Sequence, residues 1–77
     1  MNDKLVKLIC DVFSVDEHQL EETLNIRELD DWDSLKHMEF VVRLEKIFNI
    51  ELSADEIPRL KNLASIEGIL AQKPPKS

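Results

Sequence analysis

Three residues around position 34 have side chains that could do chemistry. Asp33 and Ser34 are adjacent and His37 follows one helical turn later, so a carboxylate, a nucleophile and a base occur together. Neighbouring side chains at one helix end rarely converge with an oxyanion site, and Gly68, the only glycine, lies far from this segment. A serine hydrolase is therefore the least favoured interpretation, and we predict no catalytic residue. We expect His37 to be a partly solvated helix residue.

Ser34 is better suited to carry an attached group. It follows four residues that include three aspartates and it opens the longest apolar helical pattern in the chain. Backbone N–H groups and the helix dipole at such a start stabilise an attached phosphate. On local pattern alone, a serine here is most often a helix cap, and either Asp33 or Ser34 can take that position. Both assignments leave the hydroxyl near solvent.

Apolar residues recur at helical spacing in three parts of the chain. The first set predicts a helix over residues 2–13, which Ser14 and Val15 end. The longest set, over residues 35–48, covers well over half of the helix circumference, so this helix should be the central one. A last helix should begin after a cap at Asn62. Its buried side is formed by Leu63, Ile66, Ile69 and Leu70.

The two connections between these helices differ in length. Residues 16–33 form the first, which is long compared with the roughly 2–8 residues usual in a bundle, and loops of that length tend to be functional or pinned by apolar anchors. In the second, Ser53 and Glu56 have the spacing of a reciprocal helix cap, which predicts a short helix ending near Leu60. Pro58 should bend that helix, because proline removes a backbone hydrogen bond.

The composition predicts one small helical domain. A chain of 77 residues with 43% hydrophobic content can bury one modest core, but not a deep enzyme cleft as well. One glycine, 5% aromatic and 34% charged residues favour helices over a sandwich or barrel. The predicted fold is all-α: a four-helix bundle of three longer helices and one short helix over residues 1–72, with a long loop between the first two. We expect residues 73–77 to form a disordered tail.

Charge and cysteine content narrow the possible partners. The net charge of −6 argues against nucleic acid and against an anionic membrane surface, because both require a basic footprint. Cys10 is the only cysteine and His18 lies far from His37, so we predict neither a disulfide nor a metal site. No apolar run has membrane length. We expect a cytoplasmic monomer without stable membrane insertion.

The order of these features resembles the acyl carrier protein family. The matching residues are Asp33, Ser34 and Leu35 at a helix start, the amphipathic helix that ends at Phe48, and the Ile-Glu-Leu run at 50–52. The resemblance covers nearly the whole chain. It implies that Ser34 carries a 4′-phosphopantetheine arm, transferred from coenzyme A by a phosphopantetheinyl transferase, and that Asp33 and Leu35 belong to the cofactor-binding site.

The resemblance also implies a carrier rather than an enzyme. Acyl intermediates would be held as thioesters on the arm and delivered to acyl-loading, ketosynthase or acyltransferase-type enzymes in fatty acid, polyketide or related biosynthesis. Tethering raises the effective concentration of each intermediate at its next enzyme. A peptidyl or aminoacyl carrier and an unmodified helical interaction module remain alternatives.

The charge layout departs from that of common fatty-acid carriers, whose second helix presents a mainly acidic face. Here Lys36, Arg43 and Lys46 lie on that helix, whereas residues 1–33 hold ten acidic against three basic residues. We therefore hypothesise that partners contact the acids of the connection more than the helix face. The departure favours a specialised pathway over general fatty acid synthesis.

The predicted docking residues combine these acids with one edge of the central helix. They are Glu28, Asp30, Asp31, Asp33, Leu35, Met38, Glu39, Val42 and Glu45. The three apolar members of this set lie on an arc wider than packing alone requires, so we expect them to be partly exposed. Trp32 most simply anchors the connection against the bundle, and Cys10 is interpreted as a packing residue.

Overall fold

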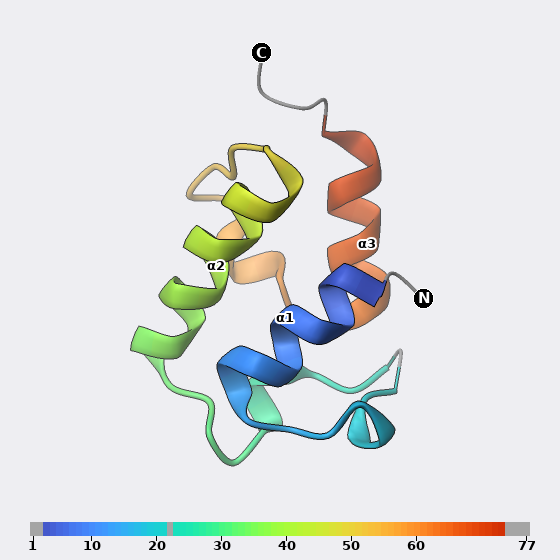
Figure 1. The fold of residues 1–77 in the computed structure, drawn as a ribbon. Helices are drawn as coiled ribbons and strands as arrows, with labels where there is room; N and C mark the ends of the chain where they lie inside the picture. Colours follow the sequence, from blue (N-terminus) through green and yellow to red (C-terminus); the bar gives the residue numbers. More distant parts are fainter. Residues whose placement is uncertain (1–2, 22, 74–77) are drawn as a thin grey trace.

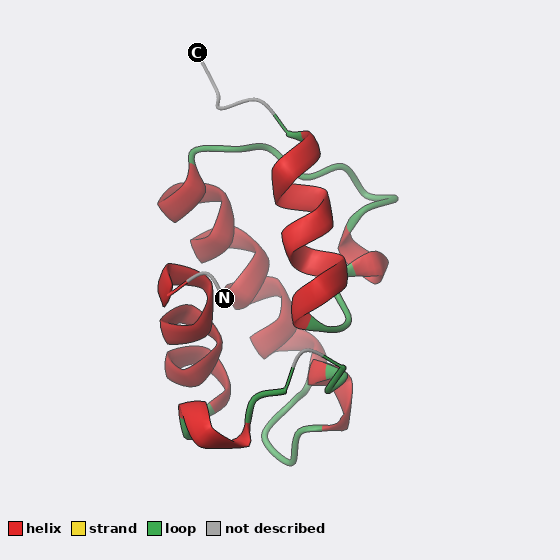
Figure 2. Ribbon diagram, turned by 90° about the vertical axis from the view of Figure 1, so that its right-hand side faces the viewer, coloured by secondary structure: helices red, strands yellow, loops and turns green. Residues whose placement is uncertain are grey.

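The computed structural model describes residues 3–21 and 23–73, and every regular element within them is helical (Figures 1 and 2). Three are α-helices and three are short 3₁₀ helices. In chain order they are α1 (Asp3–Phe13), η1 (Glu17–Gln19), η2 (Ile26–Glu28), α2 (Ser34–Phe48), η3 (Ile57–Arg59) and α3 (Leu63–Gln72). The all-α prediction is therefore confirmed.

The three α-helices surround one core, with α1 lying across the space between α2 and α3 in Figure 1. The Phe13 ring at the end of α1 meets the Phe40 ring of α2 at a centroid distance of 5.8 Å. Both rings are fully buried. The other buried apolar residues are Leu5, Val6, Leu8, Ile9, Val12, Leu20, Ile26, Val41, Leu44, Ile50, Leu52, Leu60, Leu63 and Ile66. This core fixes the position of the α2 start.

The long connection between α1 and α2 is folded against the bundle. Ser14, with φ of 55°, ends α1 in the left-handed region, and η1 then begins with a reciprocal cap between Asp16 and Gln19. The buried side chain of Ile26 anchors η2, and its N–H donates to the Lys61 carbonyl at 2.6 Å. These contacts pin the connection to the segment just before α3.

The predicted short helix ending near Leu60 is present as the 3₁₀ helix η3 after a turn, and not as an α-helix, so the four-helix count is not confirmed. Pro58 has no N–H to donate to the Ala54 carbonyl, so an α-helical ladder does not continue. The expected reciprocal cap is also incomplete. Glu56 Oε1 accepts from the Ser53 N–H at 2.9 Å, but the Glu56 N–H donates to the Ser53 carbonyl instead of the hydroxyl.

The predicted last helix is α3, and Asn62 is its cap. Asn62 Oδ1 accepts from the Ser65 N–H at 2.8 Å, while Ser65 Oγ accepts from the Asn62 N–H at 3.1 Å. Leu63 and Ile66 are buried, and Ile69 and Leu70 are half-buried against the core. Lys73, placed in the tail by the sequence, donates from Nζ to the Glu51 carbonyl at 2.8 Å. The rest of the predicted tail, 74–77, lies outside the described residues.

Candidate functional site

Ser34 is the first residue of α2, and its side chain is not needed to cap the helix. Asp33 is the cap: its backbone is extended, and its Oδ1 accepts from the Lys36 N–H at 2.7 Å. Ser34 is exposed. The hydroxyl therefore sits at a solvent-facing helix start beside backbone N–H groups, a place that favours a phosphate ester. Of the two caps that the sequence allowed, the structure has Asp33.

His37, one turn into α2, is only 5% exposed, so the expectation of a partly solvated side chain is wrong. Its Nδ1 accepts from the Trp32 indole N–H at 3.2 Å, and its Nε2 lies 3.1 Å from the Ile57 carbonyl oxygen. Both ring nitrogens are thus engaged in internal contacts. A histidine held in this way is not placed to accept a proton from Ser34, which removes the base that a hydrolase would need.

Trp32 anchors the connection as predicted. Its side chain is half-buried against the core, and its ring meets the His37 ring edge-on with centroids 5.8 Å apart. The Arg27 guanidinium of η2 lies 5.7 Å from the Trp32 ring centroid. The residue two positions before Ser34 is therefore held by contacts from both η2 and α2.

An apolar edge runs along the outside of α2, and we define it as Leu35, Met38 and Val42. These side chains are 83%, 47% and 45% exposed, respectively, and their exposure was predicted. Ile47 is also 44% exposed, but at about 100° per residue it lies on another side of the helix. Leu35 is adjacent to Ser34, so this edge begins at the candidate site.

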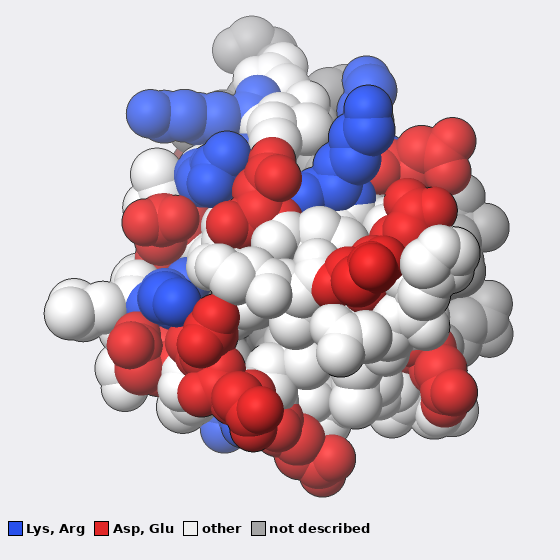
Figure 3. All heavy atoms as spheres, turned by 60° about the horizontal axis from the view of Figure 1, so that its bottom comes forward, with Lys and Arg blue, Asp and Glu red and all other residues white. Residues whose placement is uncertain are grey.

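Three of the predicted docking acids, Glu28, Asp30 and Asp31, are exposed and precede the α2 start. We call them the loop acid patch. Figure 3 views the molecule from the connection side: acidic side chains spread across this face, while basic ones lie mostly toward its upper edge. Asp31 lies 3.9 Å from Lys36 Nζ, so one acid of the patch is shared with α2.

The two predicted docking acids on α2 already have partners within the chain. Glu39 forms an exposed ion pair with Arg43 at 3.6 Å, one helical turn away. Glu45 Oε2 accepts from the Leu52 N–H at 2.8 Å in a half-buried contact. The Glu45 carboxylate thus closes the turn that follows α2, a role that the sequence pattern did not indicate.

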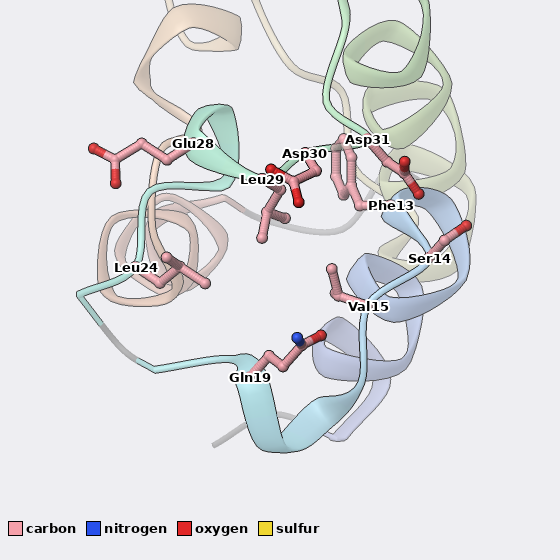
Figure 4. A pocket seen from close by; sticks show the side chains of 9 residues that line it. All are labelled: Phe13, Ser14, Val15, Gln19, Leu24, Glu28, Leu29, Asp30 and Asp31. Atoms are coloured by element: carbon pink, nitrogen blue, oxygen red, sulfur yellow. The ribbon is translucent and has the colours of Figure 1, made fainter.

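A hollow of about 400 Å³ lies between the end of α1 and the connection (Figure 4). The side chains of Val15, Gln19, Leu24 and Leu29 point toward it, and those of Asp30 and Asp31 lie at one side. Its wall combines apolar and acidic groups. No sequence pattern indicated this hollow, because its walls come from the end of α1 and from separate parts of the connection.

Two other kinds of site are absent from the described residues. Residues 3–21 and 23–73 contain no group of three or more His, Cys, Asp or Glu side chains placed to hold a metal ion. No helix in this part of the chain is long and apolar enough to cross a membrane. Cys10 is half-buried against the core, and this burial raises the pKa of its thiol.

Comparison with known proteins identifies the family. Residues 3–70 match the family described as "Phosphopantetheine attachment site". The chain belongs to this family of carrier proteins. Carriers of this family hold acyl groups on a covalent 4′-phosphopantetheine cofactor and are not enzymes. The family implies interaction with transferase and synthase partners.

Two curated relatives agree with the family assignment. The chain is 26% identical over 69 residues to the polyketide-8 synthase acyl carrier protein 1 of Streptomyces avermitilis, covering 90% of this chain and 82% of the relative. It is 34% identical over 61 residues to the acyl carrier protein of Lactobacillus acidophilus, covering 79% of this chain and 76% of the relative. The chain is thus similar to one acyl carrier protein named for a polyketide synthase and to another named only as an acyl carrier protein.

Proposed function

We propose that the 4′-phosphopantetheine arm is attached to Ser34 and that the domain over residues 1–72 works as the carrier of a specialised acyl pathway. The observation that carries this proposal is the exposed Ser34 at the start of α2, where Asp33 supplies the cap. An exposed hydroxyl that is free of the capping role can be approached by a modifying enzyme without unfolding the helix.

The residues around Ser34 fit a phosphodiester. The first backbone N–H groups of α2 point toward the helix start and carry partial positive charge, which favours an attached phosphate. The acids of the preceding loop oppose it, but they are exposed, so the high dielectric constant of water weakens their repulsion and salt screens it beyond about 8–10 Å. Asp33 supports the site by holding the helix start, and the exposed Leu35 offers an apolar surface beside the arm.

The arm supplies a terminal thiol that holds the acyl group as a thioester. The protein supplies the tether point and the docking surface, and this makes each delivery nearly intramolecular. We expect the partners to be a phosphopantetheinyl transferase and acyl-loading, ketosynthase or acyltransferase-type enzymes, in the cytoplasm, where coenzyme A is available. The similarity to a polyketide carrier supports a pathway of that kind.

Intact mass after loading tests the attachment residue. Incubation with coenzyme A and a broad-specificity phosphopantetheinyl transferase should add one phosphopantetheinyl group to the wild type and none to Ser34→Ala. Ser14→Asn is the matched control, because Ser14 is also exposed beside a helix end and asparagine tolerates its φ of 55°. It should load fully. A wild-type chain that stays unmodified would favour an unmodified interaction module instead.

Charge reversal tests which surface the partners contact. We expect that changing Glu28, Asp30 and Asp31 to lysine slows acyl transfer from a partner enzyme more than changing Lys36, Arg43 and Lys46 to glutamate. The reason is that residues 1–33 carry most of the negative charge and their acids border the α2 start. The association rate at low salt is the measurement. Equal losses from both sets of changes would contradict this assignment.

A further inference from the structure

A buried imidazole joins three segments around the α2 start. The indole N–H of Trp32, in the connection, donates to His37 Nδ1 at 3.2 Å. On the other side of the ring, His37 Nε2 lies 3.1 Å from the carbonyl oxygen of Ile57 in η3. The ring is 5% exposed and stands edge-on to the indole at 66°. One side chain of α2 thus contacts both the connection and η3.

These contacts fix the protonation pattern of the imidazole. The Trp32 indole nitrogen can only donate, so His37 Nδ1 must be the accepting, unprotonated nitrogen. The Ile57 carbonyl can only accept, so Nε2 must carry the proton and donate. The neutral ring satisfies both partners, and each of its two nitrogens has a hydrogen-bond partner. Its hydrogen-bonding pattern is directional, which an apolar side chain at position 37 would not reproduce.

The hydrogen-bonded residues Trp32 and His37 lie on either side of Ser34 in the sequence. Trp32 is the residue before the cap Asp33, and His37 is the fourth residue of α2. A contact between these two positions fixes the angle at which the chain enters a helix. Ser34 lies between them. Its hydroxyl direction therefore depends on a segment that the Trp32–His37 pair holds in place, with Arg27 on the indole ring as a further contact.

We propose that His37 is a positioning residue for Ser34: by accepting the Trp32 indole hydrogen bond, it holds the cap segment so that the Ser34 hydroxyl meets the transferase in its reactive orientation. The inference rests on Ser34 being the attachment residue. His37 acts through Trp32 and does not touch coenzyme A. The donation to Ile57 keeps the tautomer that leaves Nδ1 free to accept.

Two amide substitutions separate the two contacts of the ring. The amide oxygen of His37→Asn lies where Nδ1 was, so it keeps the acceptor for Trp32 and loses the donor to Ile57. The amide of His37→Gln reaches the Nε2 position, so it keeps the donor to Ile57 and loses the acceptor for Trp32. Trp32→Phe keeps an aromatic ring but removes the indole donor. For all three variants, the measurement is the rate of loading with coenzyme A and a broad-specificity transferase.

We expect His37→Gln and Trp32→Phe each to lower kcat for loading about tenfold, because misplacing a reacting atom by less than 1 Å already costs this much. The KM for the carrier should stay near the wild-type value, because the exposed docking residues are unchanged. His37→Asn should load within about twofold of wild type. The double variant that combines His37→Gln with Trp32→Phe should load no more slowly than either single variant, because both changes remove the same hydrogen bond.

A spectroscopic signature separates positioning from a merely structural role. Trp32 is the only tryptophan, so the protein has one indole N–H signal in a proton–nitrogen NMR spectrum. That signal should keep its hydrogen-bonded shift in His37→Asn and move toward the free value in His37→Gln. Circular dichroism at the assay temperature must show each variant folded, and Trp32→Phe serves as the second test if His37→Gln does not fold.

The outcomes distinguish this inference from the proposed function. If wild-type protein is not loaded at Ser34, the proposed function fails. If the wild type loads but His37→Gln and Trp32→Phe load at the wild-type rate while folded, the positioning role is overturned. Equal slowing by His37→Asn and His37→Gln would overturn it as well, because the loss would then follow the Ile57 contact or packing rather than the indole hydrogen bond.

Discussion

The starts of α2 and α3 use a serine in opposite ways. At α3, Ser65 occupies the third helical position, and its hydroxyl accepts from the Asn62 N–H at 3.1 Å and donates to the Asn62 carbonyl at 3.0 Å. At α2 the cap Asp33 closes the helix alone, Lys36 stands at the third position, and Ser34 is exposed at the first. The hydroxyl at the third position of α3 is thus engaged in capping hydrogen bonds, whereas the hydroxyl at the first position of α2 remains accessible for modification.

Exchanging each serine for alanine should give the largest and most sharply opposed effects. Ser34→Ala should lose all loading and keep its free energy of unfolding within about 0.5 kcal/mol, because the hydroxyl takes no part in the cap. Ser65→Ala should load at the wild-type rate but lose about 1 kcal/mol of stability, because it breaks a reciprocal cap. Urea unfolding and intact mass measure the two properties. A Ser65→Ala protein that is folded yet not loaded would contradict the distinction.

Replacing the first leucine of each helix should give the second-largest contrast between α2 and α3. Leu63 in α3 is 2% exposed, whereas Leu35 in α2 is 83% exposed. Leu63→Ala should lower the free energy of unfolding by about 2–5 kcal/mol through cavity formation. Leu35→Ala should change it by less than about 0.5 kcal/mol and should instead slow transfer to partner enzymes. If Leu35→Ala leaves every partner reaction unchanged, the apolar edge is not a docking surface.

Replacing either cap residue with alanine should lower stability by a similar amount, but only one of the two changes should affect loading. Asp33→Ala and Asn62→Ala should each lose about 1 kcal/mol, because each removes the acceptor for a backbone N–H at a helix start. Only Asp33→Ala should also slow loading, by about tenfold, because the helix start that presents Ser34 becomes less defined. Loading rates at a temperature where both variants are folded make the comparison. Equal rates for the two variants would show that Asp33 has no role beyond stability.

The smallest expected effect concerns the end of α3, where Lys73 bonds to Glu56. It is a change in how stability depends on pH. A hydrogen bond from Lys73 and bonds from Ser53 lower the pKa of Glu56 from 4.5 to about 2. Because the folded pKa is the lower one, this carboxylate stabilises the fold above pH 4.5, and its contribution is lost as the pH falls toward 2. Wild type and Glu56→Gln should therefore differ in stability at neutral pH and converge near pH 2. A constant difference across this range would rule out the linkage.

The α-helices and the candidate serine were accessible from the sequence because both depend on local patterns. Periodic apolar residues define α1, α2 and α3, and the cap at Asn62 follows from residue type and spacing. The over-wide apolar arc of α2 indicated the exposed edge that includes Leu35. The resemblance across nearly the whole chain distinguished Ser34 from an ordinary helix cap, which the three-residue motif alone does not do.

The features that the sequence did not indicate depend on contacts between distant segments. His37 is buried because the Ile57 carbonyl, twenty residues later, accepts its hydrogen bond. Glu45 turns inward because the Leu52 N–H needs an acceptor after the helix ends. The short helix that ends near Leu60 is a 3₁₀ helix and not an α-helix, because Pro58 lacks the N–H that an α-helical hydrogen bond would need.

Tandem mass spectrometry of peptides from the loaded protein shows which residue carries the arm. We expect the phosphopantetheinyl group on the peptide that contains Ser34, with fragment ions that assign it to this hydroxyl and leave Ser14, Ser53 and Ser65 unmodified. Assignment of the group to any of those three serines in folded wild-type protein would contradict attachment at Ser34.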